Sequence, residues 1–505
     1  MKLADPGRGP QRAQRCTVSQ HLSKEPVTRT EPENAPMSTT PNRWAAMIRA
    51  STKPAYLAIA DAIADDIQAG RLAAEQRLPP LRALAKHLDL NFTTVSRGYA
   101  EAQRRKLIDS QAGRGTFVVP TPVAPAPTVA RSPAAVGLID MTMNMPPEPQ
   151  DGVIQQRLRA GLAGLREVPD LHALLRYQEF GGGPADREAG ARWLGERIPD
   201  LLPGRVLVVP GVQSALLALF SVLARPGETI CCEAITYPGV KGLAAQLGIR
   251  LMGLPSDDEG IDPEAFGAAC ASLLPKALYC NPTFLNPTTA TMSQTRREAI
   301  VEIARRYSVP IIEDDAYGFL PSAAPVPLAV LAPELVFHVT GFAKCVGAGL
   351  RVGYLATPNS RYTARLSSSL RTSSVMASPI TTHLATQWIN DGTVKLAIDA
   401  IREESRARQL IAKQVLTRAE YSAQPEAFHL WLKVPAPWNR IEFATHLRAS
   451  GVGVVVSDAF TVTGPAPEAV RVCLGGISSQ QECRHSLELI EDALETLPEV
   501  SSSVM

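Results

Sequence analysis

The chain has 505 residues, of which 45% are hydrophobic and 20% are charged, and its formal net charge is +2. This composition is typical of an ordinary globular protein. No membrane-spanning helix is expected, because the sequence has no run of about eighteen apolar residues. The eight cysteines are scattered and form no CxxC pair. That pattern favours reduced thiols in the cytoplasm, and no metal site is expected.

Residues 1–40 are polar and mixed in charge, without the apolar stretch of a secretory signal. We expect a disordered tail, within which Met37 is a candidate for the natural start of the protein. The next segment is basic: residues 41–120 hold twelve Lys and Arg against seven Asp and Glu, about +5, which leaves about −3 for the rest. A basic unit joined to a mildly acidic body hints at binding of nucleic acid.

Three helices and a hairpin are predicted in a domain at residues 41–119. In "PAYLAIADAIADDIQAGRL" (54–72), apolar residues recur at helical spacing until Gly70. A second helix follows the two prolines of "RLPPLRALAKHLDL" (77–90), and Asn91 is placed to cap a third in "NFTTVSRGYAEAQRRKLI" (91–108). The stretch "LIDSQAGRGTFVV" (107–119) predicts a β-hairpin. This order is typical of a winged helix-turn-helix.

The start of the third helix is expected to meet the base edges in the major groove, because recognition helices insert their N-terminal residues there. Thr side chains contact thymine or phosphate, and Arg contacts guanine or phosphate. The candidates are Asn91, Phe92, Thr93, Thr94 and Arg97.

Two more arginines are placed for DNA: Arg82 for the backbone, and Arg114 at the hairpin tip for the minor groove. Through "RLPPLRALAKHLDL", "TTVSRGYAEA" and "GRGTFV", the segment resembles the GntR family of regulators, which implies binding to double-stranded DNA. Phe92 departs from the family, many members of which carry Arg there, so the operator sequence stays open. The alternative is a small helical module that binds protein.

A proline-rich stretch, "PTPVAPAPTVARSP" (120–133), predicts an extended linker over residues 120–136. A second domain is expected at residues 137–498. There, helical stretches alternate with short apolar strands, which predicts a mostly parallel α/β sheet. We expect a small α+β subdomain from about residue 390. The predicted strands of the sheet are "RVLVVP", "ETICCE", "KALYCN", "VPIIEDD", "LVFHVTG" and "RVGYLA", and those of the subdomain are "AFHLWLKV", "GVGVVVS" and "AVRVCLGG".

The loop "GFAKCVGAGLRVGY" (341–354) carries two cations, Lys344 and Arg351, in otherwise small and apolar sequence. Asp314 ends an apolar strand in "IIEDDAYGF", Asn286 lies in "CNPTFLNPTTATM", and Arg471 lies in the strand "EAVRVCLGG". Each has an ordinary structural explanation, such as an exposed loop lysine, a helix cap or an edge charge. In combination they indicate one chemistry.

Pyridoxal 5'-phosphate forms a Schiff base with a lysine and needs a carboxylate beside its pyridine nitrogen. Lys344 is the catalytic candidate and Asp314 the carboxylate. Asn286 and Tyr317 are expected to hydrogen-bond the phenolic oxygen, and Arg351 to pair with the phosphate.

Two further pieces fit this cofactor. The strand–turn–helix "VVPGVQSALLAL" (208–219) offers the backbone N–H groups of Gly211, Val212 and Gln213 as a phosphate cradle, and Tyr237 could stack on the ring. A plain strand–helix turn and a core aromatic are the structural alternatives.

Residues 140–495 look like the fold-type I aminotransferases, through "YQEFGG", "PTFLNPTT", "EDDAYG", "GFAKCVGAGLRVGY" and "AVRVCLGG". The resemblance implies that Lys344 is the Schiff-base lysine and Asp314 the pyridine partner. It also implies that Arg351 and Tyr177 contact the phosphate, Tyr177 from the other subunit, and that Arg471 binds the α-carboxylate of an amino acid. The chain departs from the family in "NPTT" for NPTG, in Ala348-Gly349 for Pro-Gly, and in the hydroxyls missing just before the lysine, where Gly341 and Ala343 stand.

A winged helix-turn-helix fused to a fold-type I domain resembles the MocR subfamily of GntR regulators over nearly all of residues 50–495. This resemblance implies a bacterial transcription regulator that senses an amine, an amino acid or a B6 vitamer through pyridoxal phosphate. It also implies a head-to-tail, domain-swapped homodimer. The alternatives are a functional aminotransferase with an accessory DNA-binding module and a scaffold with a degenerate site.

Overall fold

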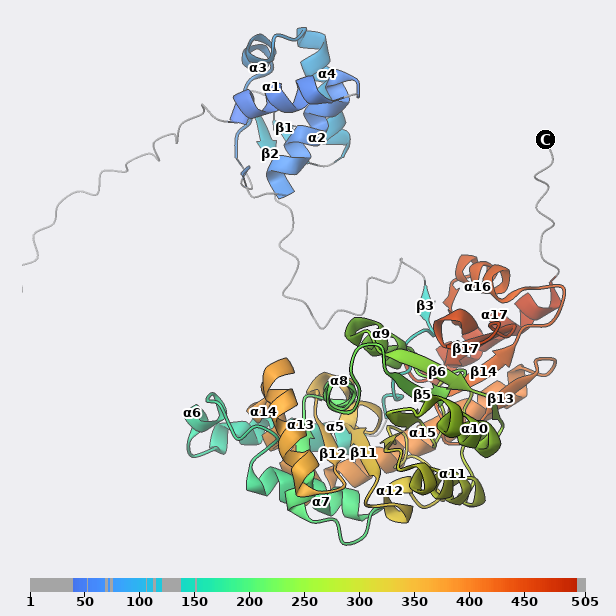
Figure 1. Ribbon diagram of the computed structural model, residues 1–505. Coiled ribbons are helices and arrows are strands. Elements are labelled where there is room, and N and C mark those ends of the chain that lie inside the picture. Colours follow the sequence, from blue (N-terminus) through green and yellow to red (C-terminus); the bar gives the residue numbers. More distant parts are fainter. Residues whose placement is uncertain are drawn as a thin grey trace, which may run out of the picture. The chain divides into compact units, whose positions relative to one another are not determined.

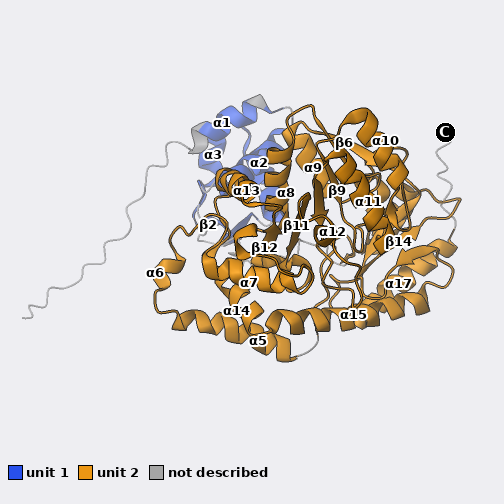
Figure 2. Ribbon diagram, turned by 60° about the horizontal axis from the view of Figure 1, so that its bottom comes forward, with its two compact units in different colours: residues 1–130 blue, residues 131–505 orange. Residues whose placement is uncertain are grey.

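The computed structural model describes residues 40–51, 53–68, 71–72, 76–105, 107–111, 115–119, 138–149 and 152–496. Residues 1–39 of the expected tail, the expected linker and Arg114 lie outside this part. The chain divides into two units, residues 1–130 and 131–505, which are coloured separately in Figure 2.

The first unit contains the predicted helices and hairpin, preceded by one helix that the sequence analysis did not predict. In chain order its elements are α1 (Thr40–Ala50), α2 (Ala55–Gln68), α3 (Leu81–Leu88), α4 (Phe92–Arg104), β1 (Ile108–Gln111) and β2 (Gly115–Val118), the two strands pairing antiparallel. The N-terminal winged helix-turn-helix is thus confirmed.

Close packing of α2 against α4 organises the core of this unit. Ile59 and Val95 are fully buried there, and a Cβ on Gly98 would come within 2.9 Å of the Ile59 side chain. The unpredicted helix α1 joins the same core through Trp44, whose indole N–H donates to the carboxylate of the buried Asp66 at 2.8 Å. The core therefore fixes α4, whose start carries the predicted DNA contacts.

The second unit is built on a seven-stranded sheet (Figure 1). Only β12 runs antiparallel to its two neighbours, and the other pairs are parallel. All six strands predicted for this sheet are present, and the α/β fold class is confirmed. In spatial order the strands are β4 (Val206–Val209), β12 (Gly353–Ala356), β11 (Val336–Gly341), β10 (Ile311–Asp314), β9 (Ala277–Cys280), β5 (Thr229–Glu233) and β6 (Arg250–Leu254).

Helices cover both faces of this sheet, because its central strands are buried on both sides. On one face, α8 (Val212–Leu223), α9 (Pro238–Leu247) and α13 (Ser360–Ser373) pack on side chains that include Tyr279 and Ile312. On the other face lie α10 (Pro263–Leu273), α11 (Gln294–Tyr307) and α12 (Leu328–Leu331). Helices α7 (Pro184–Gly195) and α14 (Pro379–Asn390) pack over β4 and β12.

A smaller four-stranded antiparallel sheet has the order β13 (Tyr421–Ala423), β14 (His429–Lys433), β17 (Ala469–Cys473) and β16 (Val455–Val456), and packs with α16 (Arg440–Ala449) and α17 (Gln480–Glu495). The long helix α15 (Thr393–Val415) connects α14 to this region (Figure 2). The segment β3 (Ile139–Asp140) pairs in parallel with β15 (Val452–Gly453), so the start of the second unit is held against its C-terminal part. No helix among the described residues has the length and apolarity to cross a membrane.

Candidate functional site

Lys344 and Asp314 follow neighbouring parallel strands of the large sheet. Asp314 is the last residue of β10, and Lys344 lies in a short 3-10 helix (Phe342–Lys344) directly after β11. Parallel strands bring their carboxyl ends to the same edge, where α/β proteins bind ligands. The charge of each residue acts on the pKa of the other and favours its charged form. The two predicted residues are therefore neighbours.

Burial dominates the protonation of both groups. It raises the pKa of Asp314 to about 6 and lowers that of Lys344 to about 8. An amine with a lowered pKa has a larger fraction in the nucleophilic neutral form near pH 7. In this structure the Lys344 amine donates to the main-chain carbonyl of Asn144, and it lies 5.8 Å from the centre of the Tyr317 ring.

Strand alternation decides which of three consecutive carboxylates faces the site. Successive side chains of a strand point to opposite faces. Glu313 accepts hydrogen bonds from Leu328 N and Ala329 N at 2.8 and 3.0 Å, beneath α12, and Asp315 pairs with Arg197 at 3.1 Å. Asp314 points to the other face.

Asp314 is held by residues that the sequence analysis missed. Its Oδ2 accepts from the Tyr279 hydroxyl at 2.8 Å, and its main-chain carbonyl accepts from the Asn281 amide at 2.5 Å. Its Oδ1 is buried with no hydrogen-bond partner among the described residues. Tyr279 is the central aromatic of "KALYCN", but nothing local in that strand indicates which carboxylate it meets.

The predicted phosphate cradle and the predicted phosphate arginine lie together. Gly211 precedes α8 with φ 83°, a left-handed conformation that suits glycine, and a Cβ there would come within 3.0 Å of the Arg351 guanidinium. Arg351 is exposed and donates to the carbonyl of Pro210 at 3.4 Å. The Tyr237 hydroxyl donates to the side-chain oxygen of Gln213 at 3.3 Å. Four of the predicted residues thus surround the N-terminus of α8, at which Val212 is the first helical residue.

Arg471 and Asn286 form the opposite side of the site. Arg471 on β17 donates to the side-chain oxygen of Asn286 at 2.8 Å and to the main-chain carbonyl of Thr142 at 2.5 Å. Its guanidinium lies 4.9 Å from the centre of the Phe460 ring, and its buried Nε has no partner in the described part of the chain. Its charge lowers the pKa of Tyr317, although burial raises that pKa overall. Arg471, Asn286 and Tyr317 are therefore close.

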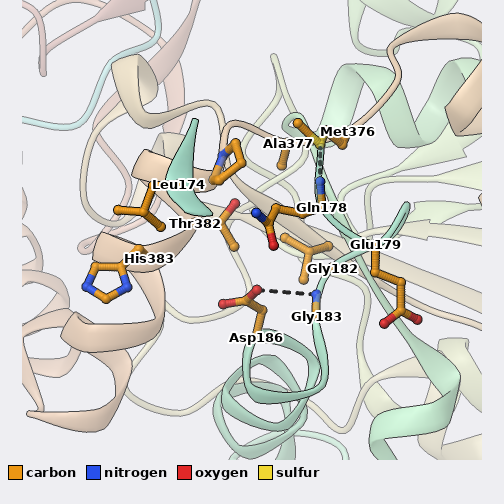
Figure 3. A pocket seen from close by; sticks show the side chains of 12 residues that line it. Leu174, Gln178, Glu179, Gly182, Gly183, Asp186, Met376, Ala377, Thr382 and His383 are labelled. Atoms are coloured by element: carbon orange, nitrogen blue, oxygen red, sulfur yellow. Dashed lines mark hydrogen bonds between the residues drawn. The ribbon is translucent and has the colours of Figure 1, made fainter. Parts of the chain in front are cut away.

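Tyr177 lies apart from these residues on the surface of the unit, with 79% of its side chain exposed. The neighbouring Gln178 lines a separate hollow of about 110 Å³ with Asp186, Met376 and Thr382 (Figure 3). The Gly183 N–H donates to Asp186 at 3.3 Å within it. No residue predicted to bind the cofactor lines this hollow, so it is a separate feature of the fold.

In the first unit, the start of α4 presents the predicted DNA contacts to solvent. Asn91 caps the helix and accepts from both the N–H and the hydroxyl of Thr93 at 3.0 Å. Phe92 is 45% exposed, and Thr94 is partly buried. The exposed Arg97 lies over the Tyr56 ring at 4.3 Å. Arg82 is exposed on α3, and Arg114 lies outside the described residues.

The residues present fit pyridoxal phosphate. A buried carboxylate oxygen without a partner suits a protonated pyridine nitrogen, and a lysine amine of lowered pKa suits an aldehyde. The helix N-terminus at Gly211 with Arg351 above it suits a phosphate dianion. Asp314, Lys344 and Arg351 would hold its three ends, and the group would supply an electron sink for amine chemistry.

Comparisons with known proteins agree with both halves of the molecule. The family model of class I and II aminotransferases matches residues 137–490, and that of bacterial regulatory proteins of the gntR family matches residues 55–118. The chain belongs to the class I and II aminotransferase family and carries a gntR-family DNA-binding domain, which together make the architecture of the MocR subfamily.

Two curated relatives are named as regulators. The chain is 29% identical over 468 residues to the uncharacterized HTH-type transcriptional regulator YdeF of Bacillus subtilis, covering 92% of this chain and 98% of YdeF. It is 26% identical over 328 residues to the probable rhizopine catabolism regulatory protein MocR of Rhizobium meliloti, covering 60% of this chain and 66% of that protein.

Solved aminotransferases share the fold of the second unit. An archaeal alanine:glyoxylate aminotransferase superposes with a TM-score of 0.65 at 24% identity, covering 71% of this chain and 91% of that chain. LysN, the α-aminoadipate aminotransferase of Thermus thermophilus, solved with N-(5'-phosphopyridoxyl)-L-leucine, superposes with a TM-score of 0.64 at 20% identity, covering 71% and 92%.

Proposed function

We propose that this transcription regulator senses an amine through pyridoxal 5'-phosphate held by Lys344. Lys344 would bond the aldehyde of the cofactor, Asp314 would face its ring nitrogen, and Arg351 with the α8 N-terminus would hold its phosphate. The bound group would supply an electrophile for an amine. Arg471 would hold the carboxylate of an amino acid whose amine takes the place of Lys344, and the freed lysine would change the closure of the second unit and so DNA binding by the first.

One observation supports this proposal above all: Lys344 and Asp314 lie at the same edge of the sheet, and burial shifts the pKa of each so that its neutral form is favoured. Buried ionisable groups with strongly shifted pKa values concentrate at functional sites. This supports a role for both side chains in holding a bound group that carries charges of its own.

Asn286 and Tyr317 would position the phenolic oxygen of the cofactor, and Asn286 would also orient Arg471 through their 2.8 Å hydrogen bond. Tyr237 would stack on the ring. Tyr177, exposed at 79%, would reach the phosphate in the partner subunit of a homodimer. A DNA-binding regulator of this kind works in the cytoplasm, on double-stranded DNA.

The direct test combines spectroscopy with DNA binding. Purified full-length protein loaded with pyridoxal phosphate should show a visible absorbance band that borohydride removes, with the reduced cofactor attached to the peptide that contains Lys344. An effector amine should shift that band and change the affinity for operator DNA over the same concentration range. A band that responds to amines while DNA affinity stays constant would contradict the sensing role.

A working aminotransferase is the second candidate. The hydrogen-bonded pair of Arg471 and Asn286 and the lysine amine would serve transamination equally well. Steady turnover of an amino acid with a 2-oxo acid, together with no salt-sensitive duplex binding, would favour this function over regulation.

A further inference from the structure

Beside the residues assigned above, the site contains two buried polar side chains for which the cofactor has no use. Asn144 lies in the segment after β3 and is 6% exposed, and His429 begins β14 and is fully buried. The sequence analysis assigned no role to either residue, although His429 lies in the predicted strand "AFHLWLKV". The segments that carry them are 285 residues apart along the chain.

Direct contacts tie this pair to the site. The Asn144 amide N–H₂ donates to the Tyr317 hydroxyl at 2.9 Å and lies 3.3 Å from Nδ1 of His429. The imidazole packs against the Tyr317 ring with their centres 5.8 Å apart. The main-chain carbonyl of Asn144 accepts from Lys344. The pair therefore adjoins the amine on which an effector would react.

Oδ1 of Asn144 has no hydrogen-bond partner among the described residues, and Nε2 of His429 makes no hydrogen bond of ordinary geometry there, although the ring interacts with the backbone of Leu285. Leaving such an atom unpaired is unfavourable, because the atom loses its hydration without gaining a hydrogen bond in exchange. A ligand that supplies a hydrogen-bonding group to both atoms recovers this cost, whereas an apolar ligand does not. The arrangement therefore favours a polar ligand.

The charge state of the pair narrows the ligand further. Burial lowers the pKa of His429 to about 3, and the charges of Arg471 and Lys344 lower it too, while a hydrogen-bonding interaction with the Leu285 backbone raises it by less. The imidazole is therefore neutral at physiological pH and, with Asn144, offers no cation to a second carboxylate.

Two arginines that meet the carboxylates next to Asp314 are already paired. Arg197 lies 3.1 Å from Asp315, and Arg297 lies 3.6 Å from Glu313, beneath the opposite face of the sheet. Neither is available to a second carboxylate in the site.

We propose that Asn144 and His429 form the second anchor of the effector and select an amino acid whose side chain carries a neutral hydrogen-bonding group, a hydroxyl or an amide. Arg471 holds the α-carboxylate of the same ligand. This inference rests on the proposed function, because it assumes that an amine reacts at Lys344.

The test titrates the cofactor-loaded, full-length protein with L-serine, L-threonine, L-asparagine, L-glutamine, L-alanine and L-aspartate. Two readouts follow binding: the shift of the cofactor absorbance band and the rise in thermal midpoint. At least one of the four neutral polar amino acids should bind ten-fold or more tightly than alanine and aspartate. Equal or tighter binding of alanine or aspartate would overturn the inference.

Variants distinguish a specific loss of the proposed anchor from a general loss of structure. His429→Phe keeps an aromatic ring, although a larger one, and removes both nitrogens. It should weaken binding of the preferred polar amino acid at least ten-fold while changing binding of alanine less than three-fold. His429→Gln keeps a hydrogen-bonding group and should restore most of the preference. Asn144→Leu should act like His429→Phe. Equal losses for the polar amino acid and alanine would show a merely structural role.

His446→Phe is the matched control, since this partly buried histidine packs on Trp438 within the small subdomain and contacts none of the site residues. It should bind all six amino acids as the wild type does. If no amino acid shifts the band of the wild type, the proposed function and the anchor both fail. If amino acids shift the band without the predicted preference, the anchor alone fails.

Discussion

Lys344 donates a hydrogen bond from its side-chain amine to the main-chain carbonyl of Asn144, 200 residues earlier in the chain. Two residues before Asn144, the carbonyl of Thr142 accepts from Arg471 at 2.5 Å. One short segment near the start of the second unit therefore contacts both cations that a carboxylate-bearing amine would engage. A ligand that engages Arg471 and Lys344 would compete with this segment for both cations.

Replacing Lys344 with Ala should abolish the borohydride-reducible absorbance band, because the chain then lacks the amine that bonds the aldehyde. Difference spectra with and without borohydride measure the loss, and mass spectrometry of the reduced protein locates the modified residue. Lys241→Ala is the control, since the Lys241 amine is engaged by the carbonyls of Asp458 and Ala459 outside the site. A reducible band that survives in Lys344→Ala would assign the bond to another lysine.

Asp314→Asn should stabilise the cofactor-free protein at pH 8. Burial raises the pKa of Asp314 from 3.8 to about 6, so the folded protein binds a proton there more tightly than the unfolded chain does. The stability that this proton contributes is fully present below about pH 4 and is lost as the pH rises through about 6. The variant removes the cost of the buried charge, about 1–3 kcal/mol, at pH 8. Denaturant unfolding at pH 8 and at pH 4–5 measures the difference in free energy of unfolding between the variant and the wild type, which should be smaller at the acidic pH.

Asp315→Asn provides the opposite sign in the same motif. Burial raises the pKa of Asp315, but the charges of Arg197, His338 and Arg297 outweigh it and hold that pKa below its usual value. This variant should destabilise the protein at pH 8, and the loss should fade in acid. If both variants changed the free energy of unfolding at pH 8 in the same direction, this would contradict the assignment of Asp314 to the site and of Asp315 to an ion pair that supports the fold.

Arg471→Gln should weaken a carboxylate-bearing effector at least ten-fold and leave the decarboxylated amine within about three-fold, because charged hydrogen bonds contribute about 1.5–3 kcal/mol. Titration of the cofactor band with an amino acid and its decarboxylated amine measures both. The two ligands losing affinity in parallel would instead mean that Arg471 only supports the fold through Asn286 and Thr142.

The double variant Arg82→Ala and Arg97→Ala should weaken operator binding. It should also make the negative slope of log affinity against log salt concentration shallower by about 2, one unit for each lost phosphate contact. Gel shifts over a series of salt concentrations measure both. Arg104→Ala is the control, because Arg104 lies at the far end of α4 and pairs with Glu101 at 2.7 Å. An unchanged slope in the double variant would rule out this docking of α4. Phe92→Arg, which restores the residue many GntR members carry, should raise the slope.

Much of the architecture followed from local pattern. Helical spacing and caps indicated α2, α3 and α4, and strand–helix alternation indicated six strands of the large sheet. Helix α1 was missed, although Trp44, Met47 and Ile48 are spaced as on one helix face, because this short stretch adjoins a long polar tail. The antiparallel direction of β12 carried no local signal, since strand direction depends on the connection between strands.

The sequence by itself determined the two-part fold and indicated the chemical class proposed for the site. Recognisable motifs carry Lys344, Asp314, Asn286, Arg351 and Arg471, because a cofactor with three distinct ends would demand fixed residue types at strand ends and turns. Only the tertiary structure decided what surrounds them. Tyr279, Asn144 and His429 come from strands and segments that meet through folding alone, and a side chain buried by distant partners leaves no periodic or local trace in its own neighbourhood.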